Sequence, residues 1–247
     1  MNKYEDELDL FLNDILNVSK KVDLKIWLEA GTLLGCIRNN NYIPWEKDID
    51  FGSWNSFLDL NKYKSFKKKM IKKKYIINKT KNVITIKKLG FNCHADIGFY
   101  KKIGDEAVIP LNYPISKMGI MLQRLLIILS SKNISKTLQF HKSNLSKTIY
   151  RTIYYIFKFL ILFRIRKKIL KLLKKIVKKN SKDVSWKIPV KFLKKQKKIK
   201  FRKFNILIPS RSSDYMKFRY GKNWKTPRSS WNQFVEDKSI NRDQKNA

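Results

Sequence analysis

The chain has 247 residues, of which 43% are hydrophobic, so it is long enough to bury the core of one folded domain with an elaboration. The 56 Lys and Arg residues outnumber the 19 Asp and Glu residues and give a formal net charge of +37, which favours negatively charged partners. Only Cys36 and Cys93 occur, which excludes a disulfide framework and any zinc site made of four cysteines.

The sequence predicts neither a secretory signal nor a membrane-spanning helix. Residues 1–16 are acidic and amphipathic, whereas a secretory signal has a basic region followed by an apolar one. The apolar run TIYYIFKFLILF at 152–163 is interrupted by Lys158, and no run of 18 uncharged apolar residues occurs. We therefore expect a cytoplasmic protein, with peripheral binding at the inner face of the membrane as a further expectation.

The first part of the chain predicts a helix, a strand and a second, short helix. Apolar residues recur at helical spacing from about Glu5 to Lys21. LKIWLEAG at 24–31 is typical of a strand that ends at a glycine, and TLLGCIR at 32–38 predicts a short helix with Thr32 as its N-cap. After Pro44, the alternation DIDF at 48–51 predicts a half-buried strand.

The remaining segments complete an expected α+β domain with a helical insertion. YKSFKKKMIKKKYIIN predicts a helix with a cationic face, and NVITIKKLG and FNCHADIGFY predict strands. Residues 111–183 contain long apolar and basic segments with almost no acidic residues, and these segments predict helices. We therefore divide the chain into a catalytic core at 1–110, a basic amphipathic insertion at 111–183, a C-terminal element at 184–231 that packs on the core, and a polar tail at 232–247.

Three carboxylates are the candidate catalytic and metal-binding groups. Asp48 and Asp50 alternate on a strand, so they share a face about 6.6 Å apart and can hold Mg²⁺ (or Mn²⁺) together with substrate phosphates. Asp96, on a neighbouring strand, can complete a two-metal site or accept a proton from an attacking hydroxyl. His94 is expected to be a surface or polar-network residue rather than a metal ligand.

A phosphate-binding turn is expected upstream of these acids. At Gly31 and Thr32 the free backbone N–H groups of a helix N-terminus, with the threonine hydroxyl, can hold a phosphate. Arg38 can pair a phosphate bidentately, although it can equally cap the short helix and neutralise nearby acids.

The segment GTLLGCIRNNNYIPWEKDIDFG resembles the signature of the LicD/fukutin family of phosphotransferases, in which Gly-Thr-Leu-Leu-Gly and Arg precede Ile-Pro-Trp and an acidic Asp-x-Asp cluster. HADIGFY resembles the downstream strand of that family, and YMKFRYGKNWKTPRSSW resembles its C-terminal Tyr-Gly-x-x-Trp-x-x-Pro element. The resemblance covers about 24–100 and 186–231. Two features depart from it: Lys47 stands where the family often has an acid, and 111–183 carries no family motif.

The resemblance implies a nucleotidyltransferase-like fold of the polymerase-β type, a mixed sheet flanked by helices. It implies transfer of a phospho-alcohol, such as phosphocholine or phosphoribitol, from its CDP conjugate to a hydroxyl of a cell-surface or lipid-linked glycan, with release of CMP. At the matching positions it makes Asp48, Asp50 and Asp96 the metal ligands and Gly31 with Thr32 the phosphate-holding turn, while Tyr220 and Trp224 are structural.

The implied partners are the CDP-alcohol donor and the glycan acceptor, with no specific nucleic acid. The basic insertion either docks on an anionic membrane surface or packs on the core. Two other functions stay open. A sugar-nucleotide glycosyltransferase also uses Asp-x-Asp with a divalent cation, and a non-enzymatic nucleic-acid or membrane-binding protein fits the charge.

Overall fold

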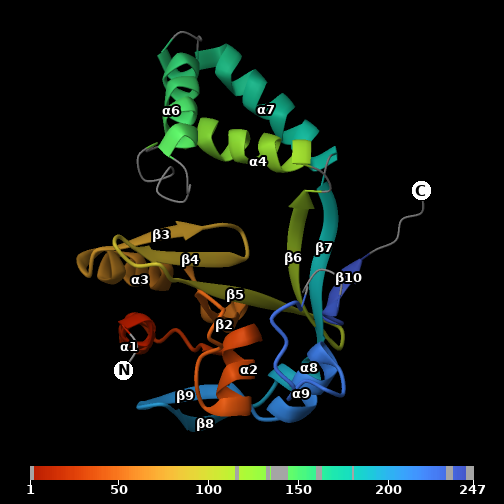
Figure 1. The fold of residues 1–247 in the computed structure, drawn as a ribbon. Coiled ribbons are helices and arrows are strands. Elements are labelled where there is room, and N and C mark those ends of the chain that lie inside the picture. The colour runs from red at the N-terminus through yellow and green to blue at the C-terminus, as the bar shows by residue number, and fades with distance from the viewer. Residues whose placement is uncertain are drawn as a thin grey trace. The chain divides into compact units, whose positions relative to one another are not determined.

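A computed structural model describes residues 3–114, 117–131, 134, 144–159, 163–179, 181–231 and 236–242. The chain divides into two compact units, Met1–Pro110 with Ser185–Asn241 and Leu111–Val184 with Arg242–Ala247. Strands and helices are mixed in the first unit, whereas helices make up most of the described part of the second (Figure 1).

The first unit is built on a mixed sheet with a parallel pair of strands at its centre (Figure 1). β2 (Asp48–Trp54) runs parallel to β5 (His94–Ile103). β1 (Trp27–Leu28) is antiparallel to β2, and β4 (Val83–Lys88) is antiparallel both to β5 and to β3 (Tyr75–Lys79). This sheet and the helices around it confirm the predicted α+β class.

Further strands extend this arrangement. β5 turns at Gly104 into β6 (Glu106–Pro114), and the sheet order runs β1-β2-β5-β6-β7-β10 with β7 (Ser181–Pro189) and β10 (Ile240–Arg242). β8 (Gln196–Phe201) and β9 (Phe204–Pro209) form a separate antiparallel hairpin. The expected polar tail therefore includes a strand residue, Ile240, and its residues 232–235 and 243–247 lie outside the described part of the chain.

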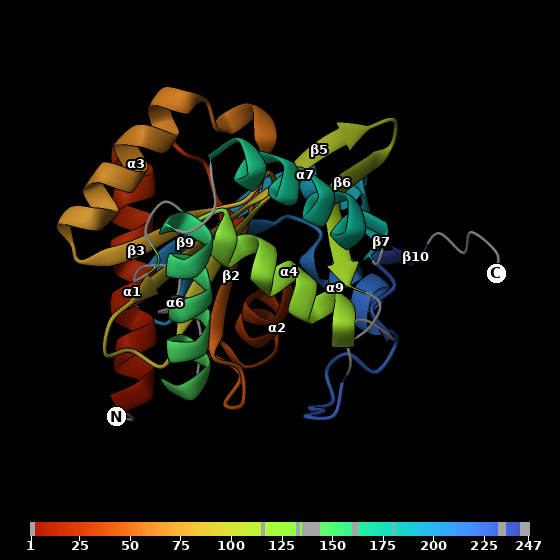
Figure 2. The same cartoon turned by 90° about the horizontal axis from the view of Figure 1, so that it is seen from above.

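The helices of the first unit bury their apolar faces. α1 (Lys3–Lys21) sets Leu8, Phe11 and Ile15 in the core and packs against α3 (Leu60–Lys72), as Figure 2 shows from above. The first helix was predicted from the spacing of its apolar residues and the second from its lysine-rich composition, and both are confirmed as helices. The others are α2 (Ala30–Asn39), the short 3₁₀ helix η1 (Asn55–Phe57), α8 (Val190–Leu193) and α9 (Ser212–Tyr220).

Three local predictions are wrong. The expected strand at 24–31 is reduced to Trp27–Leu28, because α2 already begins at Ala30. Glu29, not Thr32, is the N-cap of α2, since its carboxylate accepts the N–H of Ala30 at 2.8 Å. In addition, the residues YIIN, expected at the end of a helix, form β3, because α3 ends at Lys72 and Lys74 has a positive φ of 65°.

The second unit holds three described helices of more than one turn: α4 (Lys117–Leu129), α6 (Asn144–Phe159) and α7 (Phe163–Lys179). α4 contacts both of the others. Ile128, Ile134 and Tyr154 form a small core, and the Tyr154 hydroxyl donates to the carbonyl of Ser131 at 3.3 Å. These helices bear out the predicted basic helical insertion. Within the described residues, no helix has the length and apolar character needed to cross a bilayer.

Candidate active site

A cavity of about 600 Å³ in the first unit brings the N-terminal motif and the C-terminal element together. Among the predicted site residues, Gly31, Arg38, Asp48 and Asp50 line it, whereas Thr32 and Asp96 do not. The lining is completed by the following residues: Ala30, Leu34, Ile43, Trp45, Glu46, Arg219, Tyr220, Asn223, Trp224, Thr226, Arg228, Ser229, Ser230 and Trp231.

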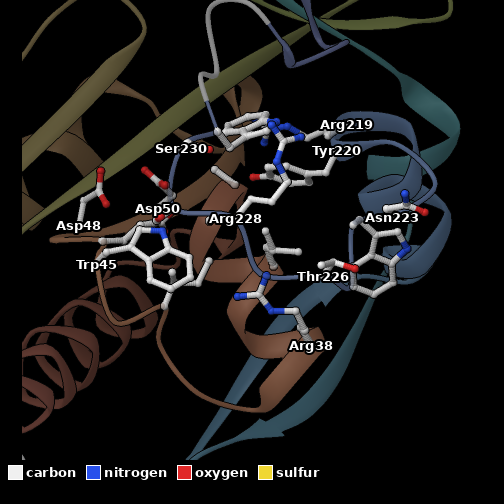
Figure 3. A pocket seen from close by; sticks show the side chains of 18 residues that line it. Arg38, Trp45, Asp48, Asp50, Arg219, Tyr220, Asn223, Thr226, Arg228 and Ser230 are labelled. Atoms are coloured by element: carbon white, nitrogen blue, oxygen red, sulfur yellow. The ribbon is translucent and has the colours of Figure 1, made fainter.

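The two strands at the centre of the sheet position the carboxylates. Asp48 and Asp50 alternate with the buried Ile49 in β2, so both lie on one face and line the cavity (Figure 3). The parallel register sets Asp50 beside Asp96 and Asp48 beside His94. His94 Nε2 lies 3.7 Å from Asp96 Oδ2, so the histidine faces a carboxylate, as expected for a residue of a polar network.

The acids are close enough to affect one another. Burial, and then the charges of Asp48 and Asp96, raise the pKa of Asp50 well above its ordinary value. Burial and the neighbouring charge of Asp48 raise the pKa of Glu46 to about 7. Burial also raises the pKa of Asp96, and a hydrogen bond from the Thr85 side chain partly offsets this by lowering that pKa. A concentration of negative charge therefore stands within a strongly basic chain.

This concentration of acids suits a divalent cation, although the described side chains do not form a ready metal cage. Among the described residues, no three His, Cys, Asp or Glu side chains are arranged as a set of metal ligands. Asp96 Oδ1 is buried and accepts no hydrogen bond from the described part of the chain, so one carboxylate oxygen keeps its coordinating capacity. Hard oxygen donors of this kind are the ligands that Mg²⁺ takes, commonly one or two carboxylates with substrate phosphates.

Helix α2 and strand β2 are joined through Thr32. Its hydroxyl oxygen accepts the backbone N–H of Asp50 at 2.9 Å, and the side chain is 3% exposed. The backbone N–H of Glu29 donates to the carbonyl of Asp50 at 2.9 Å. Both backbone groups of Asp50 are thus held by the α2 end of the motif. In this structure Thr32 fixes the position of a carboxylate, and its expected role in phosphate binding stays a prediction.

Because Gly31 has no Cβ atom, it leaves space for the carboxylate of Glu46. A Cβ atom added at Gly31 would lie 1.9 Å from Glu46 Oε2 and 2.3 Å from Glu46 Oε1. The Glu46 carboxylate therefore lies directly against the first turn of α2, where the helix dipole favours a negative charge. A carboxyl group already stands where the sequence predicts a phosphate.

We expect Gly31→Ala to lower the free energy of unfolding by no more than about 1 kcal/mol, because the displaced carboxylate is the far end of the flexible Glu46 side chain and alanine favours the helix. Urea denaturation of the purified protein measures the loss. Adding Glu46→Ala to Gly31→Ala removes the clashing carboxylate and should recover most of the stability. An equal loss in the single and the double variant would contradict the proposed clash.

A buried ion network connects the motif to the end of the described chain. Arg219 Nη1 donates to Glu29 Oε2 at 3.1 Å, and Arg219 Nε donates to Asp237 Oδ2 at 3.0 Å. The Tyr215 hydroxyl lies 3.0 Å from both oxygens of Glu29, and burial raises its pKa, so it remains a hydrogen-bond donor. Ser239 donates its N–H and its hydroxyl to Asp237 Oδ1. All five residues are buried.

The C-terminal element supplies the side chains that the sequence did not identify. In Figure 3, Asp48, Asp50 and Trp45 gather at one side of the cavity, and Asn223 and Thr226 at the other. Tyr220 and Trp224, expected to be structural, line the cavity, and the ring of Tyr220 lies 4.6 Å from that of Trp231. The dense run of aromatic and hydroxyl residues after Tyr220 is the sequence signal that could have identified them.

Comparisons with solved structures find weak resemblances. ANT(2")-Ia in complex with adenylyl-2"-tobramycin matches with a TM-score of 0.30 and 11% identity, over 40% of this chain and 52% of that chain. Terminal uridylyl transferase 4 from Trypanosoma brucei with bound GTP matches with a TM-score of 0.31 and 16% identity, over 42% of this chain and 33% of that chain.

Two curated relatives match a short stretch at 39% identity over 41 residues, which is 17% of this chain. They are the uncharacterized proteins RP689 of Rickettsia prowazekii (strain Madrid E) and RT0683 of Rickettsia typhi (strain ATCC VR-144 / Wilmington). The match spans 15% and 13% of the length of these relatives.

The family comparison agrees with the motif. Residues 23–104 match the family model described as LicD/FKTN/FKRP, nucleotidyltransferase domain. This range contains the Gly31–Thr32 turn, Arg38 and the three carboxylates Asp48, Asp50 and Asp96. Over residues 23–104, about a third of its length, this chain therefore resembles the nucleotidyltransferase domain of the LicD/FKTN/FKRP family.

Proposed function

We propose that this LicD-family transferase moves a phospho-alcohol, phosphocholine-like or phosphoribitol-like, from a CDP-alcohol to a hydroxyl of a cell-surface or lipid-linked glycan and releases CMP. One observation carries the proposal: Asp48 and Asp50 share one face of a strand and line a cavity that also contains Arg38 and Arg228. Acids that can hold a cation thus stand across from cations that can hold phosphates.

Each side chain has a defined part in the proposed transfer. Asp48 and Asp50, with Asp96 on the adjacent strand, would hold Mg²⁺ or Mn²⁺. Such an ion, when bound, neutralises the charge that develops on the phosphoryl oxygens. Arg38 and Arg228 would pair the pyrophosphate through their planar guanidinium groups, so the phosphorus is presented to the acceptor.

The transfer breaks one bond and forms one. The acceptor hydroxyl oxygen bonds to the phosphorus of the phospho-alcohol while the bond from that phosphorus to the CMP oxygen breaks, with the two oxygens roughly in line. The acceptor proton passes to a carboxylate, for which Asp96 is the candidate. The enzyme then works mainly by positioning and by charge neutralisation.

The aromatic lining supports a substrate with flat or cationic groups. Trp45, Tyr220, Trp224 and Trp231 all line the cavity. Aromatic faces can stack on a cytosine ring, and they also attract a quaternary ammonium group. Both groups occur in CDP-choline, so this lining favours a donor of that kind over one with a polyol alone.

The function is tested by incubating the protein and Mg²⁺ with a panel of CDP-alcohols and a cell-envelope extract, followed by mass spectrometry of the products. We expect CMP and a glycan whose mass has increased by one phospho-alcohol. Consumption of a UDP- or GDP-sugar, with every CDP-alcohol left intact, would show a glycosyltransferase instead.

Removal of divalent cations is expected to abolish CMP release, because the acids at the cavity then repel the phosphates of the donor. Activity is measured after dialysis against EDTA and again after addition of Mg²⁺ or Mn²⁺, and we expect either ion to restore it. The same dialysis with EDTA already saturated by Mg²⁺ is the control. CMP release that continues at the original rate in EDTA would exclude metal-dependent transfer.

A further inference from the structure

The second unit exposes apolar side chains along α6. Ile149, Ile153 and Ile156 recur at intervals of four and three residues, which sets them on one helical face, and each is exposed. Phe159, at the end of the same helix, is 71% exposed. Tyr154 and Phe157, on the adjoining part of the helix surface, are buried. α6 therefore carries a broad apolar surface, and only one side of it is used for packing.

α7 likewise has both buried and exposed apolar side chains. Leu173 and Val177 are buried, whereas Ile165, Leu172 and Ile176 are exposed and recur at intervals of seven and four residues. At 100° per residue these three lie within one narrow stripe, apart from the buried pair. Large aliphatic side chains that point to solvent in a regular stripe mark a surface that contacts something apolar.

Charge accompanies both stripes. Residues 111–180 contain 17 Lys and Arg and no Asp or Glu. On α7 the exposed side chains of Lys168, Lys175 and Lys179 border the stripe on the side away from the buried pair. The second unit therefore offers an apolar stripe bordered by cations, with no acid of its own between Leu111 and Asn180 to neutralise them.

We propose that α6 and α7 dock on an anionic lipid bilayer, lying in the headgroup region without crossing it. Exposed Ile, Leu and Phe side chains would enter the boundary of the acyl chains, and the long lysine side chains would reach back to lipid phosphates. Charge complementarity selects this partner. A second copy of the same face would meet only cations, and RNA would be held by the cations and would leave the aliphatic stripes in water.

The proposed membrane docking depends only on residues of the second unit. If the proposed function is also correct, one consequence rests on it: the enzyme is concentrated at the surface where lipid-linked acceptors lie. Failure of the two proposals can be told apart, because vesicle binding is measured without donor or acceptor, and CMP release is measured without vesicles.

The test is sedimentation of the full chain with vesicles of phosphatidylcholine containing phosphatidylserine, and with vesicles of phosphatidylcholine alone. We expect binding to the anionic vesicles, with a partition coefficient at least about tenfold lower for the triple variant Ile165→Ser, Leu172→Ser and Ile176→Ser. The matched control changes three exposed apolar residues of the first unit, Leu60→Ser, Leu89→Ser and Ile103→Ser, and should bind like the wild type.

A second triple variant, Lys168→Glu, Lys175→Glu and Lys179→Glu, should lose binding to the anionic vesicles while its circular dichroism stays that of the wild type. Equal sedimentation of the wild type and both α7 variants would overturn the proposal. A polyuridylate titration can also overturn the proposal. Tight polyuridylate binding that is lost in the lysine variant, together with vesicle binding that is unchanged in the aliphatic variant, would identify a nucleic-acid surface.

Discussion

Asp50→Asn is expected to lower kcat for CMP release by about a thousandfold, which corresponds to about 4 kcal/mol of lost transition-state stabilisation. The backbone of Asp50 is held by Thr32 and Glu29, so an amide can take the same place while it loses the charge that holds the cation. Steady-state CMP release with a saturating CDP-alcohol measures the effect.

The same variant separates a catalytic loss from a folding defect. Without divalent cations, Asp50→Asn should melt above the wild type, because Asp48, Asp96 and Glu46 no longer face a fourth carboxylate. Mg²⁺ should raise the melting temperature of the wild type and leave that of the variant unchanged. Asp105→Asn, in the exposed β5–β6 turn, is the matched control. Activity of Asp50→Asn within a factor of three of this control would exclude Asp50 as a metal ligand.

Arg219→Met is expected to lower the free energy of unfolding by about 3–5 kcal/mol, because it leaves two buried carboxylates, Glu29 and Asp237, without their cation. Urea denaturation followed by circular dichroism measures the loss. Arg219 also lines the cavity, so CMP release should fall even at temperatures where the variant is fully folded.

Helix α9 offers a control for this effect. Arg211, at the start of the same helix, pairs with Asp214 at 2.8 Å on the exposed surface, and Arg211→Met should cost less than about 1 kcal/mol. Adding Glu29→Gln to Arg219→Met removes one of the two stranded charges, so the double variant should lose less stability than the sum of the single changes. Similar losses for Arg219→Met and Arg211→Met would refute a buried network.

Local patterns predicted the parts of the site that depend on neighbours in sequence. The alternation of Asp48, Ile49 and Asp50 gives a strand with both acids on one face, since side chains in a strand alternate. The ordered motif from Gly31 to Asp50 predicted the resemblance that the family model also finds, and the downstream Asp96 was expected on the adjacent strand, where the register puts it.

The remaining features depend on contacts between distant segments. Glu29 and Arg219 are 190 residues apart in the chain, and no pattern of residues near either one predicts that they form an ion pair. The same contacts explain the error at the start of α2, where Glu29 is held by Tyr215 and Arg219 and caps the helix in place of Thr32. Propensity assigns a cap from the residue type, whereas tertiary packing decided it here.

The Glu29–Arg219–Asp237 network also bears on synthesis of the protein. Glu29 leaves the ribosome 190 residues before its cation, Arg219, and the second carboxylate, Asp237, follows later still. The cavity walls that carry Tyr220 and Trp231 arrive equally late. The network and the walls of the cavity can therefore form only after Trp231 and Asp237 have left the ribosome.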